Sequence, residues 1–392
     1  MVRCALHGAC SPKVITFHVS WRLLLLVLIS LSCPGIVWAD WRPAWFEGRR
    51  YVPMEDVANF YDLRLKLSPN GREFSLTSPR WNLLGRRDSK ELMINGVKII
   101  LCFPVHFQNG NFFLSSMDLV KIVEPILRPQ RIKNPGPVNT VVLDAGHGGY
   151  DTGAVCLYGP EKNFTLDIVR RAAQLLEQQG YQVRLTRTTD KFVPLGQRAA
   201  IANQIPNSIF VSVHFNQSRS TMARGVETYC LAPLGVPSMD EALATHRDFK
   251  PCLGQEQDPQ NTALATAIHA SVVRTLGLPD RGIKRARYAV IRELRVPGVL
   301  VEGGFLSDAA DLQKLASSYY REQLAKGIVQ GIDNYRRALD TKRQPSLSTK
   351  TLLTTSGPPP SLQNERSLMK IMAPHLSSDL IGLIFPSSLP AL

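Results

Sequence analysis

The chain has 392 residues, of which 44% are hydrophobic and 20% are charged, and its formal net charge is +14. This length leaves room for two domains, and the apolar content is enough to give each of them a buried core. The positive charge favours anionic partners, although it can also serve solubility alone. The sequence contains no basic run interleaved with aromatic residues, so we expect no nucleic-acid partner.

The first 39 residues have the pattern of a cleaved secretory signal. Arg22 precedes the apolar run LLLLVLISLSC, and the small-residue sequence VWA ends at Ala39. The run is shorter than the roughly 20 residues of a membrane span, so an uncleaved membrane anchor is the second interpretation. Cleavage would remove three basic and no acidic side chains, leaving a net charge of +11. We therefore expect an exported protein of the periplasm or cell envelope, with wall polymers, lipid head groups or acidic peptides as partners.

Residues 40–128 are predicted to form a small α+β domain. Two segments, RYVPMEDVANFYDL from Arg50 and NFFLSSMDLVKIVEPIL from Asn111, each predict a short strand that turns into a helix. Asn-Gly pairs at Asn95 and Asn109 predict hairpin turns. This pattern resembles the copper amine oxidase N-terminal-like domain of envelope proteins. The resemblance implies a wall-targeting or positioning module, and it does not imply bound copper.

The rest of the chain is predicted to hold a linker, a larger domain and a tail. Residues 129–139 are rich in proline and basic side chains, which is typical of a linker. Strands and helices then alternate over residues 140–340, which predicts an α/β domain with a mostly parallel, twisted sheet and helices on both faces. Residues 341–392 are rich in Ser, Thr and Pro, so we expect a disordered tail there.

The stretch VNTVVLDAGHGGYDTGA, from Val138 to Ala154, joins an apolar run to a glycine-rich loop around His147. A mononucleotide loop needs a lysine followed by Ser or Thr, and a dinucleotide turn needs GxGxxG directly before a helix. Neither pattern is met, so we expect no nucleotide. Glycines on both sides of His147 instead leave its imidazole unshielded at the carboxyl end of a buried strand, where open α/β sheets place their sites.

Three further polar side chains are expected at the same edge of the sheet. Glu161 opens the following helix, His214 ends the apolar strand IFVSVH, and Glu302 ends the strand GVLVE. Two imidazoles and one carboxylate are the three protein ligands of a typical catalytic zinc site, and a second carboxylate nearby can act as a general base. Each residue alone has another explanation, because a glutamate complements a helix N-terminus and a histidine at a strand end can simply be solvated. Their joint arrangement is what indicates a zinc site.

The ordered motifs LDAGHGGYDTGA, FVSVHFN, RGVETY, LPDRGIKRA and VLVEGGFLSD resemble the zinc-dependent N-acetylmuramoyl-L-alanine amidases of bacterial cell-wall turnover and division. The resemblance implies that His147, Glu161 and His214 bind one Zn²⁺ and that Glu302 is the catalytic carboxylate. The substrate that it implies is peptidoglycan, cut at the amide between N-acetylmuramic acid and L-alanine.

Other residues are expected to support this site. Asn216 resembles a family position two residues beyond the second histidine. Asp144 could orient a zinc ligand, or it could be a plain carboxylate at a strand end. Arg187 and Arg198 are interpreted as structural residues.

An insertion at about residues 231–262 bears on regulation. Some division amidases have a long helix here that covers the zinc until an activator protein binds. In this chain several prolines interrupt the segment, so we do not expect a long occluding helix, and an activator remains a candidate partner. Cys230 and Cys252 flank the first part of the insertion. As a hypothesis they form a disulfide, which would stabilise the fold by roughly 3 kcal/mol.

Two alternative functions differ in class. A non-catalytic wall-binding protein should have lost a zinc ligand or the base, and this sequence retains all four candidates. A zinc peptidase or carboxypeptidase acting on stem peptides would use the same metal and base, so only the family resemblance favours the amidase.

Overall fold

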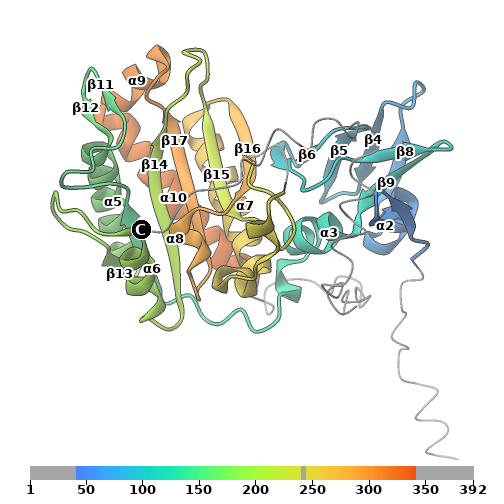
Figure 1. Ribbon diagram of the computed structural model, residues 1–392, viewed down its shortest axis with the longest axis horizontal. Coiled ribbons are helices and arrows are strands. Elements are labelled where there is room, and N and C mark those ends of the chain that lie inside the picture. The colour runs from blue at the N-terminus through green and yellow to red at the C-terminus, as the bar shows by residue number, and fades with distance from the viewer. Residues whose placement is uncertain (1–40, 240–243, 341–392) are drawn as a thin grey trace, which may run out of the picture. The chain divides into compact units, whose positions relative to one another are not determined.

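The computed structural model describes residues 41–239 and 244–340 (Figure 1). The expected signal at residues 1–39 and the expected tail at 341–392 lie outside these described residues. Within the described part of the chain, no helix has both the length and the apolar character that crossing a bilayer requires.

The first sheet has the strand order β1-β2-β9-β8. Val52 on β2 lies opposite Leu114 on β9 in an antiparallel pair, so the two similar sequence segments lie side by side at the centre of this sheet. Each strand leads directly into helical structure, as their sequences predicted. The elements are β1 (Ala44–Phe46), β2 (Arg49–Pro53), α2 (Met54–Tyr61), β8 (His106–Gln108), β9 (Asn111–Ser115), α3 (Ser116–Asp118), a π-helical turn (Leu119–Val123) and α4 (Glu124–Leu127).

Five antiparallel strands follow α2 as a meander. The turn between β6 and β7 is formed by Asn95 and Gly96, with φ of 49° and 80°. Both residues therefore have the positive φ that a tight hairpin turn requires, which explains the Asn-Gly pair in the sequence. The strands are β3 (Arg64–Leu67), β4 (Glu73–Thr77), β5 (Asn82–Arg86), β6 (Glu91–Ile94) and β7 (Val97–Ile100).

The larger domain is built on a mostly parallel sheet, as predicted. β13, β10, β14 and β17 are parallel neighbours in that order. β15 pairs antiparallel to β17, and β16 pairs parallel to β15. All six residues of β10 are buried, because helices cover both faces of the sheet. The strands are β10 (Thr140–Ala145), β13 (Gln182–Leu185), β14 (Ser208–Asn216), β15 (Val226–Leu231), β16 (Asp280–Ala286) and β17 (Gly298–Phe305), with a short hairpin of β11 (Val155–Cys156) and β12 (Gly159–Pro160).

Helices cover the two faces of this sheet in separate cores. α5 (Glu161–Gln178), α7 (Asp258–Leu276) and α10 (Ser318–Leu339) pack together on one face. On the other face, α6 (Leu195–Asn203) and α8 (Ala289–Arg292) cover a smaller core. Ser317 has an extended backbone, with φ −74° and ψ 128°, and separates α9 (Ala309–Ala316) from α10.

The meander and the larger sheet form one continuous sheet through β7 and β16. Ile99 on β7 pairs with Ile283 on β16 in parallel register. The backbone nitrogen of Lys98 also donates to Asp280 Oδ2 at 2.8 Å. β16 was not among the strands expected from the sequence, and its outer edge is where the first domain attaches.

The insertion after β15 contains no long helix among its described residues. It forms two short 3₁₀ helices, His246–Phe249 and Leu253–Gln257, as the prolines predicted. The expected disulfide between Cys230 and Cys252 is wrong, because both cysteines are free. Cys230 is buried in β15 with its Sγ 3.7 Å from the carbonyl oxygen of Lys284, whereas Cys252 Sγ lies 3.8 Å from Nη1 of Arg287. The two thiols therefore face different neighbours.

Candidate metal centre

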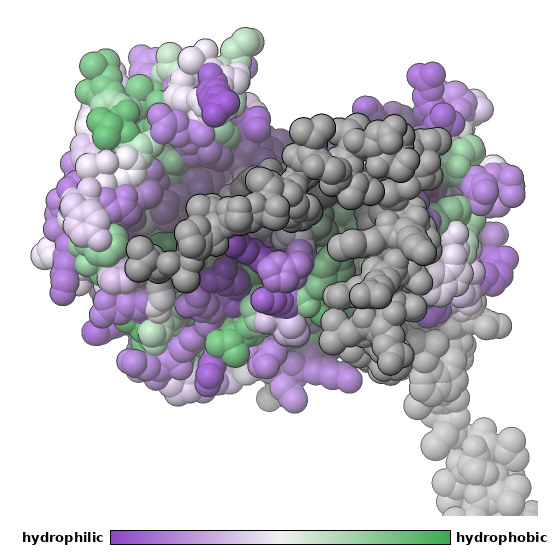
Figure 2. Space-filling view, viewed as in Figure 1, coloured by the Kyte–Doolittle hydropathy of each residue, from purple (hydrophilic) through white to green (hydrophobic). Residues whose placement is uncertain are grey.

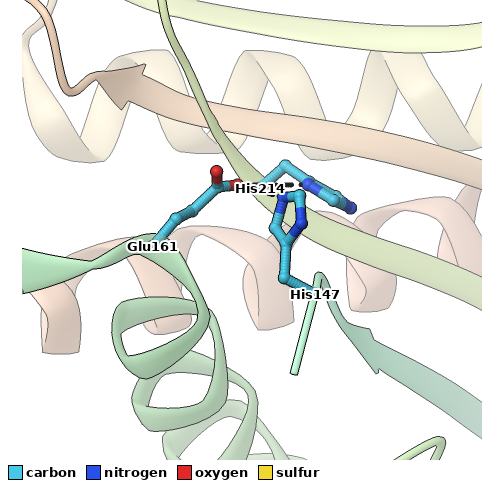
Figure 3. Close-up of side chains that lie close together, drawn as sticks. All are labelled: His147, Glu161 and His214. Carbon is cyan, nitrogen blue, oxygen red and sulfur yellow. Dashed lines mark hydrogen bonds and ion pairs between the residues drawn. The ribbon is translucent and has the colours of Figure 1, made fainter. Parts of the chain in front are cut away.

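The carboxyl ends of β10 and β14 and the first turn of α5 bring three side chains together. His147 follows β10, Glu161 is the first residue of α5, and His214 lies near the end of β14. Figure 3 shows their side chains pointing toward one another from these three elements. One ligand atom from each lies within 4.8 Å of the others. Residues far apart in the sequence thus converge at the sheet edge where they were expected.

The carboxylate of Glu161 lies between the two imidazoles. Its Oε1 is 3.2 Å from His147 Nε2 and 3.1 Å from His214 Nδ1. Burial opposes ionisation of this carboxyl, but hydrogen bonds from the two histidines outweigh burial and hold the pKa of Glu161 well below its usual range. Glu161 is therefore an anionic ligand candidate at neutral pH.

Backbone groups fix the orientation of the Glu161 carboxylate. The backbone nitrogen of Phe215 donates to Oε1 at 2.9 Å, and that of Ala154 donates to Oε2 at 3.0 Å. Because both oxygens are held, the side chain is set in place by the chain around it and not only by the two imidazoles.

Two glycines of the GHGGYDTG loop leave room for this arrangement. A Cβ at Gly146 would lie 2.4 Å from Cε1 of His214. A Cβ at Gly153, where φ is +63°, would lie 2.6 Å from Glu161 Oε2. The glycines therefore allow side chains from α5 and β14 to approach the loop. This close approach explains the glycine-rich motif without a bound phosphate.

His147 is oriented by Asp151, a residue that the sequence interpretation missed. Nδ1 of His147 lies 2.8 Å from Asp151 Oδ1, so Nε2 is left facing Glu161 and His214. The backbone of Gly148 pairs with that of Asp151 in a tight turn, which places the carboxylate beside the ring. A carboxylate that accepts from the far nitrogen of a ligand histidine is a common supporting contact in metal sites, and an acid four residues after His147 was the available signal.

Glu302 lies on the strand next to His214. The two residues are register partners on β17 and β14, so their side chains project from the same face of the sheet. Oε2 of Glu302 is buried and has no hydrogen-bond partner in the described residues. Burial, followed by the negative charges of Glu161 and Glu227, raises the pKa of Glu302 well above its usual range.

Glu227 is a second buried acid that the sequence interpretation missed. It is the register partner of Glu302 from the other side, on β15. Its Oε1 lies 2.6 Å from Arg281 Nε and 2.5 Å from Lys284 Nζ. Asn216, a candidate supporting residue, donates to Oε2 of Glu227 at 2.9 Å. Asn216 thus contacts the site through Glu227. Glu227 is part of the motif GVETY, but nothing in that motif indicated its role.

Asp144 reaches the cluster indirectly. Its carboxylate accepts from Thr186 at 2.6 Å, from Ser212 at 2.7 Å and from Arg198 Nη1 at 2.9 Å. Nη2 of Arg198 in turn donates to the carbonyl oxygen of His147 at 2.7 Å. Asp144 therefore orients Arg198, and Arg198 holds the backbone of the first histidine.

Arg187 also supports the backbone of the loop. Its guanidinium donates to the carbonyl oxygens of Ala145 at 3.0 Å and Gly146 at 2.8 Å. A further donation reaches the carbonyl oxygen of Lys162 on α5 at 2.8 Å. The interpretation of both arginines as structural residues agrees with these contacts.

The donor set of the cluster fits a zinc ion. Two imidazoles and one carboxylate are the ligands of a catalytic zinc site that leaves a position open. Among the described residues, the buried Oε2 of Glu302 has no hydrogen-bond partner, and the ionised Glu161 nearby raises the pKa of Glu302. A divalent cation at the cluster would favour the charged form of Glu302.

Comparison with known proteins identifies the family of this domain. Residues 141–334 match the family described as Amidase_3, N-acetylmuramoyl-L-alanine amidase. The chain is 33% identical to YqiI of Bacillus subtilis (strain 168) over 196 residues, which are 50% of this chain and 84% of that protein. This chain belongs to the N-acetylmuramoyl-L-alanine amidase family. The family predicted from the ordered motifs is thereby confirmed.

Further members of the amidase family are similar over the same domain. The amidase AmiC of Neisseria meningitidis serogroup B is 32% identical over 247 residues, which cover 58% of this chain and 59% of AmiC. This chain therefore matches less than two thirds of that relative's length. The structure of the catalytic domain of CwlV, an N-acetylmuramoyl-L-alanine amidase from Bacillus (Paenibacillus) polymyxa var. colistinus, is 32% identical, with a TM-score of 0.43, and covers 51% of this chain and 99% of CwlV.

Proposed function

We propose that this chain is a peptidoglycan hydrolase that cleaves the amide bond between N-acetylmuramic acid and L-alanine. The observation that supports this most strongly is the convergence of His147, Glu161 and His214, with Glu302 on the adjoining strand, in a chain of the amidase family. The substrate lies outside the cytoplasmic membrane, so this function also requires export by the predicted signal.

His147, Glu161 and His214 are proposed to hold one zinc ion. When bound, zinc polarises the scissile carbonyl and increases the acidity of water at neutral pH. Asp151 bonds Nδ1 of His147, so that Nε2 of the neutral ring can bind the ion, and the backbone nitrogens of Phe215 and Ala154 hold the Glu161 carboxylate. The chain therefore contributes a donor set whose orientation is fixed before substrate arrives.

Glu302 is proposed to be the general base and then the general acid. Its carboxylate accepts a proton from the attacking water as the water oxygen bonds to the lactyl carbonyl carbon. It then delivers that proton to the nitrogen of L-alanine as the carbon–nitrogen bond breaks. Because no described residue bonds Oε2 of Glu302, this oxygen can take part in both transfers.

Digestion of purified peptidoglycan, with and without a chelator, tests this function. Mass spectrometry of the soluble products should show free stem peptides that begin with L-alanine, released only when zinc is present. Peptides trimmed internally would instead support a zinc peptidase. Binding without any product would support a wall-binding protein. An activator protein remains a candidate partner, and a rise in rate on adding envelope extract to the purified chain would reveal it.

A further inference from the structure

The two flanks of the metal-binding cluster differ in chemistry. The sheet order is β13-β10-β14-β17-β15-β16, and the cluster with Glu302 occupies β10, β14 and β17. The segments after β13 and β10 carry the aromatic residues Phe192 and Tyr150, whereas β15 and β16 carry Glu227, Arg281 and Lys284. At about 4.8 Å between strands, the flanks are separated by roughly 19 Å from β10 to β16. A substrate that lies across the strands at this site would place one end on each flank.

The aromatic flank presents an exposed ring in a fixed position. Tyr150 is 80% exposed, yet it stacks on Phe192 with ring centroids 4.3 Å apart and an interplanar angle of 29°. One face of Tyr150 is thus covered by Phe192, and the other is available to solvent. The residue lies three positions after His147, so it is at most about 11 Å from that ligand along the chain.

The turn that carries Tyr150 is held at several points. Gly149 donates its backbone nitrogen to Asp190 Oδ1 at 2.7 Å. Lys162 Nζ bonds both the carbonyl oxygen of Gly149, at 2.7 Å, and Asp190 Oδ2, at 2.6 Å. A Cβ at Gly149 would lie 2.7 Å from the backbone nitrogen of Phe192, so the glycine permits the approach that stacks the two rings. The exposed ring is therefore preorganised.

Apolar side chains are also exposed on the hairpin that follows this turn in the sequence. Figure 2 shows hydrophobic residues gathered over the hairpin of β11 and β12. Val155 is 64% exposed and Leu157 is 86% exposed on this hairpin. On the opposite flank, Arg281 and Lys284 share the single carboxylate of Glu227. One positive charge is left in excess, and the Arg281 side chain is 37% exposed.

We propose that Tyr150 forms a sugar subsite, on which the glycan strand stacks, while the stem peptide extends toward Arg281 and Lys284. This inference rests on the proposed function, because the substrate joins a sugar to a peptide at the scissile amide. The sugar end is uncharged and its pyranose rings have an apolar face of C–H groups, which matches an exposed aromatic ring. The peptide end carries carboxylates, which match the excess positive charge. The opposite orientation would place carboxylates over aromatic rings and sugar over buried ions.

Binding of peptide-free glycan strands whose lactyl carboxyl groups have been reduced to alcohols tests the subsite without any turnover, because such strands are uncharged and lack the scissile amide. For the full chain, Tyr150→Ala should weaken glycan binding about three- to tenfold, as loss of an aromatic stack does. Tyr150→Phe should bind within about twofold of wild type. Tyr319→Ala, which removes another exposed tyrosine, should have no effect. Glycan binding by Tyr150→Ala equal to that of wild type, or no binding by wild type, would overturn the subsite.

Replacement of Arg281 tests the proposed orientation of the substrate, with the peptide toward Arg281 and the glycan on Tyr150. Arg281→Gln should bind peptide-free glycan like wild type but should raise KM for intact peptidoglycan. Tyr150→Ala should also raise the KM for intact peptidoglycan, by the same factor by which it weakens glycan binding. Its kcat should stay within about twofold of wild type. On a lactyl-L-alanyl peptide without sugar, Tyr150→Ala and wild type should have equal rates. Weakened glycan binding by Arg281→Gln would overturn the orientation.

The subsite and the proposed function fail separately. Glycan binding that depends on Tyr150, without release of peptides that begin with L-alanine, would contradict the function and leave the subsite standing. Normal release of those peptides, with Tyr150→Ala binding glycan as wild type does, would contradict the subsite alone.

Discussion

Glu227 and Glu302 are register partners on β15 and β17, and their carboxyl groups have opposite environments. Glu227 is bonded by Arg281, Lys284, Tyr229 and Asn216, whereas Glu302 Oε2 is buried with no partner among residues 41–239 and 244–340. Ion pairing holds one acid in its charged form and burial favours the neutral form of the other. The two neighbouring acids therefore differ in their preferred charge state, which is consistent with the proposed proton-transfer role of Glu302.

Replacement of Glu302 should separate metal binding from turnover. Glu302→Gln keeps the shape of the side chain but cannot accept the proton from water, so kcat should fall about 100- to 10,000-fold. Zinc content, measured by mass spectrometry, should stay at one ion per chain. Glu293→Gln, at an exposed ion pair with Arg292, is the matched control. Wild-type turnover by Glu302→Gln would show that the base has been misassigned.

The stability of the zinc-free protein should depend on pH through Glu302. Burial, with the charges of Glu161 and Glu227, raises the pKa of Glu302 well above its usual range. The contribution of Glu302 to stability is therefore greatest below its unfolded pKa of about 4.3 and falls as pH rises toward the folded pKa, by about 1.4 kcal/mol for each unit of pKa difference. Urea denaturation of chelated wild type should show this loss relative to Glu302→Gln between about pH 4.5 and pH 7. Equal pH profiles for the two proteins would contradict the assignment.

Asp151 should contribute to zinc affinity without contacting the ion. Asp151→Asn removes the carboxylate that accepts from His147 Nδ1, so zinc affinity should fall about 10- to 100-fold. Competition with a chromophoric chelator measures this directly. Asp88→Asn, at an exposed position of the first domain, serves as the control. An unchanged affinity for Asp151→Asn would mean that the loop backbone alone orients the ring.

Asp144 should matter chiefly for stability. It forms a fully buried ion pair with Arg198 at 2.9 Å, so Asp144→Ala leaves a buried guanidinium unpaired and should cost about 3 to 5 kcal/mol in the free energy of unfolding. Glu73→Ala, which breaks an exposed pair with Arg86, should cost less than about 1 kcal/mol. Urea denaturation compares the two. A similar loss in the free energy of unfolding for the two variants would show that the Asp144–Arg198 ion pair is not needed for stability.

The sequence alone was enough to predict that the candidate zinc ligands and the candidate base lie at one edge of the sheet. His147, His214 and Glu302 each follow a short run of apolar residues that predicts a buried strand, and parallel strands end at one edge of a sheet. Glu161 was placed by the helix that it begins. Strand and helix periodicities are local, so they could be read without knowing the fold.

Contacts between distant strands could not be read in this way. The pairing of Glu227 with Glu302 depends on β15 running antiparallel to β17, and no local pattern specifies the direction of a strand. β16 was missed because its sequence, DRGIKRA, is polar, although it attaches to β7 of the first domain. The expected disulfide failed for a similar reason, since sequence spacing does not determine which way two thiols face.

The central claim is that His147, Glu161 and His214 hold one zinc ion beside Glu302. Anomalous diffraction from crystals of an active preparation, recorded on both sides of the zinc absorption edge, tests it most directly. We expect a single peak bounded by Nε2 of His147, the Glu161 carboxylate and the His214 ring, with the Glu302 carboxyl facing it. A peak elsewhere, or no peak in crystals of fully active protein, would contradict the account.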